Sequence, residues 1–147
     1  MSIAPLIGAI AAGNTAVVKP SEHTPNTSKI IIKIIESVFP KEYVAVVEGD
    51  STVSQQLLAE RWDYIFFTGS TRVGQIVYES AAKHLTPVTL ELGGKNPTIV
   101  DETANLKIAA DRIAWGKFLN AGQTCIATDY IIAHQSIKEE LIEQLRK

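Results

Sequence analysis

The stretch YIFFTGSTRVG, residues 64–74, decides the fold of this 147-residue chain. Its aromatic and aliphatic start predicts a strand, the glycine at position 69 predicts a turn, and the apolar residues that follow recur at helical spacing. A strand that passes through a short turn into a helix is the unit from which parallel α/β sheets are built. The same turn opens a helix N-terminus, whose free N–H groups favour phosphate.

The alternation of strand and helix continues on both sides of this stretch, with connections of only a few residues. Residues 25–39 contain enough isoleucine for a strand, but their length favours a helix. The sequence therefore predicts an α/β fold with a Rossmann-like parallel sheet and flanking helices. Thr24, Ser51 and Ser136 are the predicted N-caps of three helices. The predicted strands are residues 15–18, 43–47, 64–67, 88–92, 97–100 and 130–133, and the helices are residues 5–12, 25–39, 106–119, one through 73–81, one after Ser51 and one after Ser136.

Two glycines, at positions 93 and 94, mark a predicted domain boundary, because glycine lets the backbone turn sharply. We assign residues 1–93 to part of a dinucleotide-binding domain. Residues 94–147 are then the start of an α/β catalytic domain that carries the nucleophile. The chain opens inside one apolar helix and closes at the end of another, so we expect a piece of a longer protein.

The composition excludes several classes of protein. A net charge of −2 without a basic block offers no electrostatic footprint for nucleic acid. A single cysteine excludes an intrachain disulfide and makes the reducing cytoplasm the expected compartment. The histidines show no zinc-ligand spacing, so we expect no metal site. The apolar residues 3–12 are too few to cross a bilayer and lack the charged flank of a signal peptide.

The only cysteine, Cys125, ends the segment NAGQTC, residues 120–125, where the helical pattern of residues 106–119 runs out. We therefore expect it in a loop, where a thiol can meet a substrate and act as a nucleophile. A lone cysteine is more often a small buried hydrophobe, and the segment alone leaves that alternative open.

Glu91 lies between two leucines at the end of a predicted strand, directly before the two glycines. We expect it to be partly desolvated, which suits a carboxylate to general-base chemistry near neutral pH. The alternative is an outward-facing residue on an alternating strand.

Two polar groups of residues mark a candidate cofactor site. Lys19 and Glu22 follow the first predicted strand, at the sheet edge where ligands of open α/β sheets bind. Gly69 and Gly74 have the spacing of the outer glycines of a dinucleotide fingerprint, but Thr71 replaces the middle glycine. A dinucleotide should therefore lie differently from its usual pose. The alternatives are solvated charges and ordinary strand–turn–helix packing.

Four motifs in one order resemble the aldehyde dehydrogenase superfamily over essentially the whole chain. They are GNT with KPSE (residues 13–15 and 19–22), FTGS with Gly74 (residues 67–70), LELGGK (residues 90–95) and GQTC (residues 122–125). The KNP and ATDY segments that follow the last two are similar to the class 3 or fatty-aldehyde-type branch.

The resemblance implies a role for each candidate residue. Cys125 is expected to attack an aldehyde, forming a thiohemiacetal that becomes a thioester when hydride passes to a nicotinamide. Glu91 is expected to activate the water that hydrolyses the thioester. The cofactor implied is NAD, with NADP as the alternative, because the carboxylate of Glu22 repels a 2′-phosphate. The cofactor-binding residues implied are Lys19, Glu22, Gly69, Ser70, Thr71, Gly74 and the Leu92 carbonyl.

The resemblance also implies an aldehyde substrate and a homo-oligomeric whole enzyme, but several family features lie outside this chain. These include an oxyanion-holding asparagine, a Glu-x-Phe motif that grips the nicotinamide ribose, and a strand that joins subunits. Thr128 stands where class 3 relatives have proline, so we expect a looser loop after the nucleophile. Two alternatives remain: an inactive module that binds a nucleotide or a partner chain, and a thiol acyltransferase or hydrolase. The latter needs a histidine base, and no histidine lies in a recognisable motif.

Overall fold

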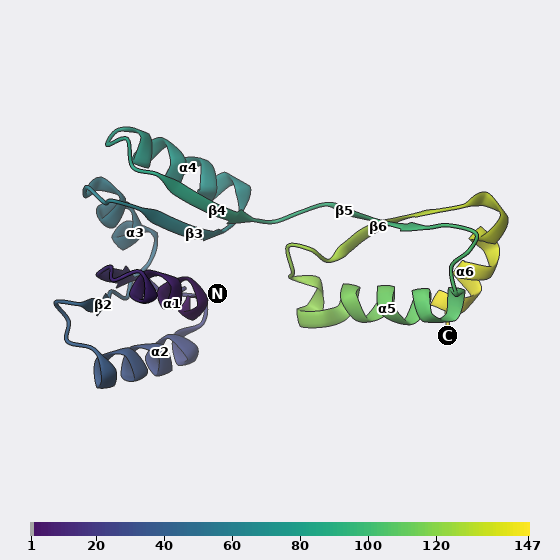
Figure 1. Ribbon diagram of the computed structural model, residues 1–147, viewed down its shortest axis with the longest axis horizontal. Coiled ribbons are helices and arrows are strands. Elements are labelled where there is room, and N and C mark those ends of the chain that lie inside the picture. Colours follow the sequence, from purple (N-terminus) through teal and green to yellow (C-terminus); the bar gives the residue numbers. More distant parts are fainter. Residues whose placement is uncertain (1) are drawn as a thin grey trace. The chain divides into compact units, whose positions relative to one another are not determined.

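The computed structural model describes residues 2–147 and divides them into two compact units (Figure 1). The first unit runs up to Thr68 and includes Arg72–Leu90, and the second contains Gly69–Thr71 and Glu91–Lys147. The division in the structure therefore falls between Leu90 and Glu91. The assignment of residues 1–93 and 94–147 to two domains of a larger protein stays a prediction.

The first unit is built around the parallel pair β1 (Ala16–Val18) and β2 (Val44–Val46). Val18 pairs with Val46, and the Val47 N–H donates to the Val18 carbonyl at 2.9 Å. Because the strands are parallel, the segments that leave them emerge at the same edge. Helices α1 (Ile3–Ala11) and α2 (Pro25–Val38) supply Leu6 and Ile35 to the core that contains Val18 and Val44.

The remaining elements of this part of the chain are α3 (Ser51–Ala59), β3 (Ile65–Gly69), α4 (Thr71–Ala82) and β4 (Val88–Leu92). Strands β3 and β4 form a second two-stranded sheet. A hydrogen bond between the hydroxyls of Tyr64 and Thr89 joins them, and the Thr86 hydroxyl donates to the Trp62 carbonyl at 2.7 Å. The α/β class is confirmed, with the strands in three two-stranded sheets rather than in one.

The second unit contains the parallel pair β5 (Asn96–Val100) and β6 (Thr128–Ala133). Helices α5 (Leu106–Phe118) and α6 (Lys138–Leu145) cover one face of this pair, and the short helices η1 (Leu119–Gly122) and η2 (Gln135–Ile137) flank β6. The core is formed by Val100, Ala110, Ile113 and Leu141. Alternate residues of the strands, Ile99, Tyr130 and Ile132, are exposed.

The first turn of α3 is capped by Asp50, and the prediction of Ser51 is wrong by one residue. The Asp50 backbone is extended, and its Oδ1 accepts from the Thr52 N–H at 2.8 Å. A side-chain oxygen reaches the second helical N–H only from this flanking position. Ser51 already belongs to the helix.

Of the other two predicted caps, one is confirmed in position only. Thr24 is the N-cap residue of α2 but makes no side-chain cap hydrogen bond, and its hydroxyl donates to the Ser21 carbonyl at 3.4 Å. The prediction of Ser136 is wrong, because Ser136 lies inside η2 and its N–H donates to Nδ1 of the N-cap residue His134 at 3.4 Å.

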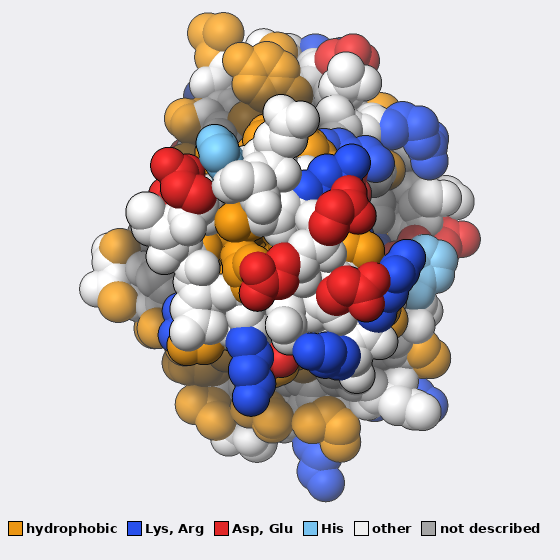
Figure 2. Space-filling model, turned by 90° about the vertical axis from the view of Figure 1, so that its right-hand side faces the viewer, with side chains coloured by type: hydrophobic (Ala, Val, Ile, Leu, Met, Phe, Trp, Pro, Cys, Tyr) orange, Lys and Arg blue, Asp and Glu red, His pale blue; other side chains and the backbone are white. Residues whose placement is uncertain are grey.

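The face shown in Figure 2 interleaves basic and acidic side chains, in keeping with the near-neutral net charge of −2. It gathers no charge of one sign into a broad patch. Across residues 2–147, none of the helices combines the length and the apolar character that crossing a bilayer requires.

The cap of α3 yields a first prediction. Asp50→Ala should lower the free energy of unfolding by about 1 kcal/mol, because the Thr52 N–H loses its acceptor. Ser51→Ala is the matched control and should change it by less than about 0.5 kcal/mol. Urea unfolding of both variants measures the difference, and an equal loss in the two would contradict the assignment of the cap.

Candidate functional site

Cys125 is exposed in the loop that joins η1 to β6, as expected from the sequence. The chain enters this loop through three consecutive residues with left-handed backbone, Asn120 (φ 52°), Ala121 (φ 55°) and Gly122 (φ 78°). Ala121 holds this conformation at a cost of about 1–2 kcal/mol, whereas asparagine and glycine adopt it more readily. The Asn120 side chain donates to the Gln123 carbonyl at 3.2 Å, which closes the turn before the cysteine.

The cysteine loop is in direct contact with the turn that follows β4. The side-chain amide of Asn96 donates to the carbonyl oxygen of Cys125 at 2.6 Å and to that of Ala127 at 3.4 Å. A Cβ atom added to Gly94 would lie 2.5 Å from the same Cys125 oxygen. The structure therefore brings together the LELGGK and GQTC segments, which are distant in sequence.

Glu91 lies on β4, the strand that leads into this contact, and its side chain is exposed. The partial desolvation expected for it is not observed in the described chain. Its connection to the cysteine loop runs through Gly94, three residues later, which closely approaches the Cys125 carbonyl. The structure places the two candidate catalytic residues on segments that touch.

Charged and hydroxyl groups hold the residues that follow the cysteine loop, at the start of β6. Asp129 lies 3.5 Å from the Lys95 ammonium and 4.0 Å from that of Lys117, measured from nitrogen to carboxylate oxygen. The hydroxyls of Thr98 and Thr128 are 2.8 Å apart across β5 and β6. The Thr128 hydroxyl thus has a partner on the neighbouring strand, and the looser loop expected from threonine in place of proline stays a prediction.

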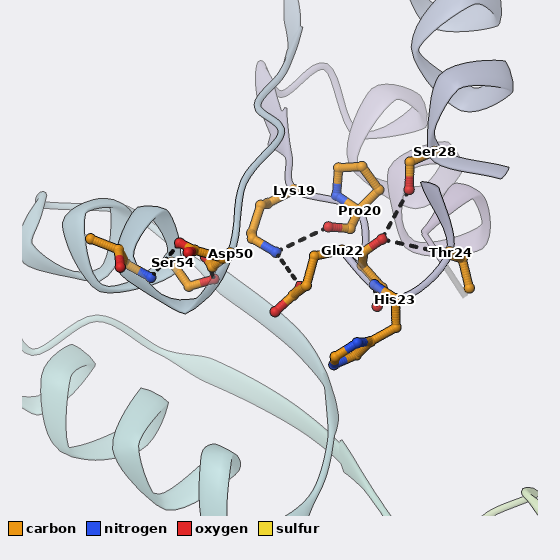
Figure 3. Close-up of polar contacts among 10 residues, drawn as sticks. Lys19, Pro20, Glu22, His23, Thr24, Ser28, Asp50 and Ser54 are labelled. Atoms are coloured by element: carbon orange, nitrogen blue, oxygen red, sulfur yellow. Dashed lines mark hydrogen bonds and ion pairs between the residues drawn. The ribbon is translucent and has the colours of Figure 1, made fainter. Parts of the chain in front are cut away.

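The candidate ribose site lies after β1 and shows a paired ammonium and carboxylate. Lys19 Nζ donates to Glu22 Oε2 at 3.0 Å and to the Pro20 carbonyl at 3.1 Å, so the two side chains point toward each other (Figure 3). A hydrogen bond from its own backbone N–H and one from Lys19 hold the pKa of Glu22 below its usual value of 4.5. Glu22 is therefore an ionised acceptor at neutral pH, and an ammonium has a third N–H to donate. This donor and acceptor set fits the hydroxyls of a ribose.

The loop that carries Glu22 is held by its neighbour Ser21. The buried side chain of Ser28, in α2, donates to the Ser21 carbonyl at 3.0 Å, and the His23 N–H donates to the Ser21 hydroxyl at 3.2 Å (Figure 3). These bonds fix the backbone on both sides of Glu22. The loop after β1 is therefore preorganised, although it lies outside any helix or strand.

The candidate phosphate site is the turn from β3 to α4. Gly69, Ser70 and Thr71 are exposed there, and a helix of 12 residues begins at Thr71. Small exposed residues at a helix N-terminus fit a phosphate group. Gly74 is buried within α4, a position that suits packing, and Leu92 is half-buried at the end of β4. Across residues 2–147, His, Cys, Asp and Glu form no group of three that would hold a metal ion.

The sequence analysis gives Asn96 and Asp129 no role of their own, although they stand in the KNP and ATDY segments. Asn96 follows the LELGGK motif directly, and these positions are the signals that the sequence offers. Its acceptor, the Cys125 carbonyl, is 29 residues away, a contact that local patterns do not encode.

The sequence model of the aldehyde dehydrogenase family matches residues 1–147. The chain is 57% identical over 143 residues to a 4,4'-diaponeurosporen-aldehyde dehydrogenase of Staphylococcus aureus, covering 97% of this chain and 31% of that protein. It is 48% identical over 147 residues to aldehyde dehydrogenase family 3 member A2 of Mus musculus, covering 100% of this chain and 30% of that protein. A solved structure described as the substrate-bound state of Staphylococcus aureus AldH matches with a TM-score of 0.92 and 56% identity, over 97% of this chain and 31% of that one. The chain thus spans about 30% of the length of these relatives.

The approach of Gly94 to the cysteine loop gives a second prediction. Gly94→Ala should lower the free energy of unfolding by about 1–3 kcal/mol, because the new methyl group meets the Cys125 carbonyl. A Cβ at Gly93 meets nothing within 4 Å, so Gly93→Ala is the matched control. It should leave stability unchanged or raise it by up to about 1 kcal/mol. Chemical denaturation of both variants tests this, and similar effects at the two positions would contradict it.

The lowered pKa of Glu22 gives a third prediction. A carboxyl whose pKa is depressed by folding stabilises the protein above its unfolded-state value, near 4.5, and the contribution is lost as the pH falls through the folded-state value. The effect should be small, because the Glu22 side chain is 37% exposed and screened by water. Wild type should therefore melt slightly above Glu22→Gln at about pH 7, and the difference should vanish at about pH 3. A difference that does not depend on pH contradicts the pairing.

Proposed function

The chain belongs to the aldehyde dehydrogenase family, and on this basis we propose that the whole protein oxidises an aldehyde to a carboxylic acid with NAD as hydride acceptor. The observation that carries the proposal is the contact between the Glu91 segment and the Cys125 loop, through Gly94 and Asn96. It brings the candidate nucleophile and the candidate base onto adjoining segments.

The nucleophile in this proposal is the Cys125 thiol. Its side chain is exposed on a loop that is fixed on both sides, so an aldehyde carbonyl has access to the sulfur. Attack forms a C–S bond, and the carbonyl oxygen takes a proton to give a thiohemiacetal. Covalent capture divides a difficult oxidation into two easier steps.

The cofactor proposed is NAD, for which Lys19 and Glu22 are the proposed ribose-binding residues and Gly69–Thr71 the proposed phosphate-binding residues. When bound, NAD takes a hydride from the carbon that is joined to sulfur. Glu22 is ionised at neutral pH, its hydrogen bonds lower its pKa further, and a carboxylate repels the 2′-phosphate of NADP. We therefore propose a preference for NAD, measured as a higher kcat/KM with NAD than with NADP.

The water-activating base proposed is Glu91. Its carboxylate removes a proton from water as the water oxygen bonds to the acyl carbon of the thioester. The C–S bond then breaks, the carboxylic acid leaves, and Cys125 regains its thiol. An exposed carboxylate at the end of β4 has the water it needs within reach.

Variants of the intact protein test the two roles separately. Cys125→Ser should remove both dehydrogenase and esterase turnover, because an alkoxide is far harder to generate than a thiolate. Glu91→Gln should retain a single burst of NADH and lose about a hundredfold in the steady-state rate, because hydrolysis of the thioester stalls. Rapid-mixing kinetics with a simple aldehyde and NAD measure both phases.

The outcomes of this experiment separate the proposed function from its alternatives. A Glu91→Gln enzyme with a normal steady-state rate would remove Glu91 as the base. Turnover that survives Cys125→Ser would remove the covalent route. Esterase activity without any NAD-dependent oxidation would favour a thiol hydrolase.

A further inference from the structure

We propose that Asn96 is a positioning residue for the nucleophile, holding the Cys125 loop against the turn of Gly93 and Gly94 that follows Glu91. The inference rests on the proposed function, because it assigns a purpose to the placement of the thiol. It concerns residues of the second unit only.

The geometry of the Asn96 side chain supports this positioning role. The two hydrogen bonds from Asn96 to the cysteine loop are called the clamp below. One amide group reaches two backbone carbonyls, that of Cys125 at 2.6 Å and that of Ala127 at 3.4 Å. Both neighbours only accept hydrogen bonds, so the NH₂ end of the amide must face them. The two bonds span the turn from Cys125 to Ala127 and leave little freedom for the peptide groups within it.

The glycine at position 94 leaves space for this contact. A Cβ atom on Gly94 would lie 2.9 Å from the Asn96 amide nitrogen and 2.5 Å from the Cys125 oxygen. Both groups therefore occupy the space that a side chain at position 94 would take. Gly94 and Asn96 therefore act together. The lack of a side chain at Gly94 leaves the space for the contact, and Asn96 donates the hydrogen bonds.

Asn96 restrains the backbone of Cys125 on its C-terminal side. Upstream, the left-handed turn of Asn120–Gly122 sets the direction in which the chain arrives. Downstream, Asn96 fixes the plane of the peptide group that begins with the Cys125 carbonyl. The Cα and the sulfur lie between these two anchors, so their position follows from both.

The clamp also relates the nucleophile to the base. Asn96 begins β5, and Glu91 lies five positions earlier on β4, with the turn of Gly93 and Gly94 between them. The positions of the Cys125 loop and of Glu91 therefore both depend on the short segment of residues 91–96. A displacement of about 1 Å between reacting groups costs on the order of a hundredfold in rate.

The test uses the intact protein with three variants. Asn96→Ala removes the donors, and Asn96→Asp keeps the size of the side chain while presenting oxygen to two carbonyl oxygens. Asn105→Ala is the matched control, because Asn105 caps α5 by accepting from the Ile108 N–H at 3.2 Å. That cap lies at the opposite end of a 13-residue helix from the cysteine loop.

Two measurements are made on each variant that melts cooperatively. The first is the rate of NADH formation in the first turnover, hereafter the burst rate, together with the KM for NAD. The second, which needs no activity, is hydrogen exchange in the peptide that covers residues 119–128. In both Asn96 variants the burst should slow by about 10- to 100-fold while the KM for NAD changes less than about twofold. Exchange should be at least about fivefold faster in them, and Asn105→Ala should alter none of these quantities.

Each outcome decides one question. A wild-type burst rate in Asn96→Asp overturns the proposal, because the side chain would then only fill space. Equal losses in Asn105→Ala overturn it as well, because general destabilisation would explain them. If the wild type forms no NADH from an aldehyde and NAD, the proposed function fails while hydrogen exchange still tests the clamp. Because Asn96→Asp keeps the shape of the side chain, it carries the test if Asn96→Ala does not fold.

Discussion

The close approach of the Cys125 carbonyl to the backbone at Gly94 is the constraint on which the candidate active site depends. At this point a loop after α5 and a turn after β4 come within hydrogen-bond distance, and Asn96 joins them at 2.6 Å. The position tolerates no side chain, so the contact is sensitive to a single methyl group. Cores elsewhere in the chain, such as that around Ile113 and Leu141, support this contact only by holding β5, β6 and α5 together.

The candidate ribose site after β1 is held by different interactions. One of these interactions is the parallel pairing of β1 and β2, which places the loops that follow the two strands at the same edge of the sheet. The other is electrostatic, because Lys19 and Glu22 neutralise each other at 3.0 Å before any ligand is present. The loop is also held by Ser28, which reaches back from α2 to the Ser21 carbonyl. A site of this kind gains from preorganisation, since little conformational entropy is left for a ligand to remove.

Periodicity predicted the order and type of the elements, and the strand expected at residues 88–92 coincides with β4. It did not predict which of two adjacent residues caps α3, because Asp50 and Ser51 both suit a cap and only the backbone angles decide. It also gave the wrong environment for Glu91, since flanking leucines on a strand point to the opposite face from the residue between them. The Asn96 contact was missed because it joins residues 29 positions apart, a separation set by the packing of β5 against β6.

The left-handed turn of Asn120–Gly122 has a consequence for the substitutions that this segment tolerates. Glycine, and less readily asparagine or aspartate, adopts such angles at low cost, so Ala121 already holds a strained backbone. A β-branched side chain at any of the three positions would add to this strain. A variant that replaces Gly122 must also accommodate a Cβ 3.1 Å from the Lys117 carbonyl. The backbone angles of the turn therefore restrict the substitutions that can be made just before Cys125.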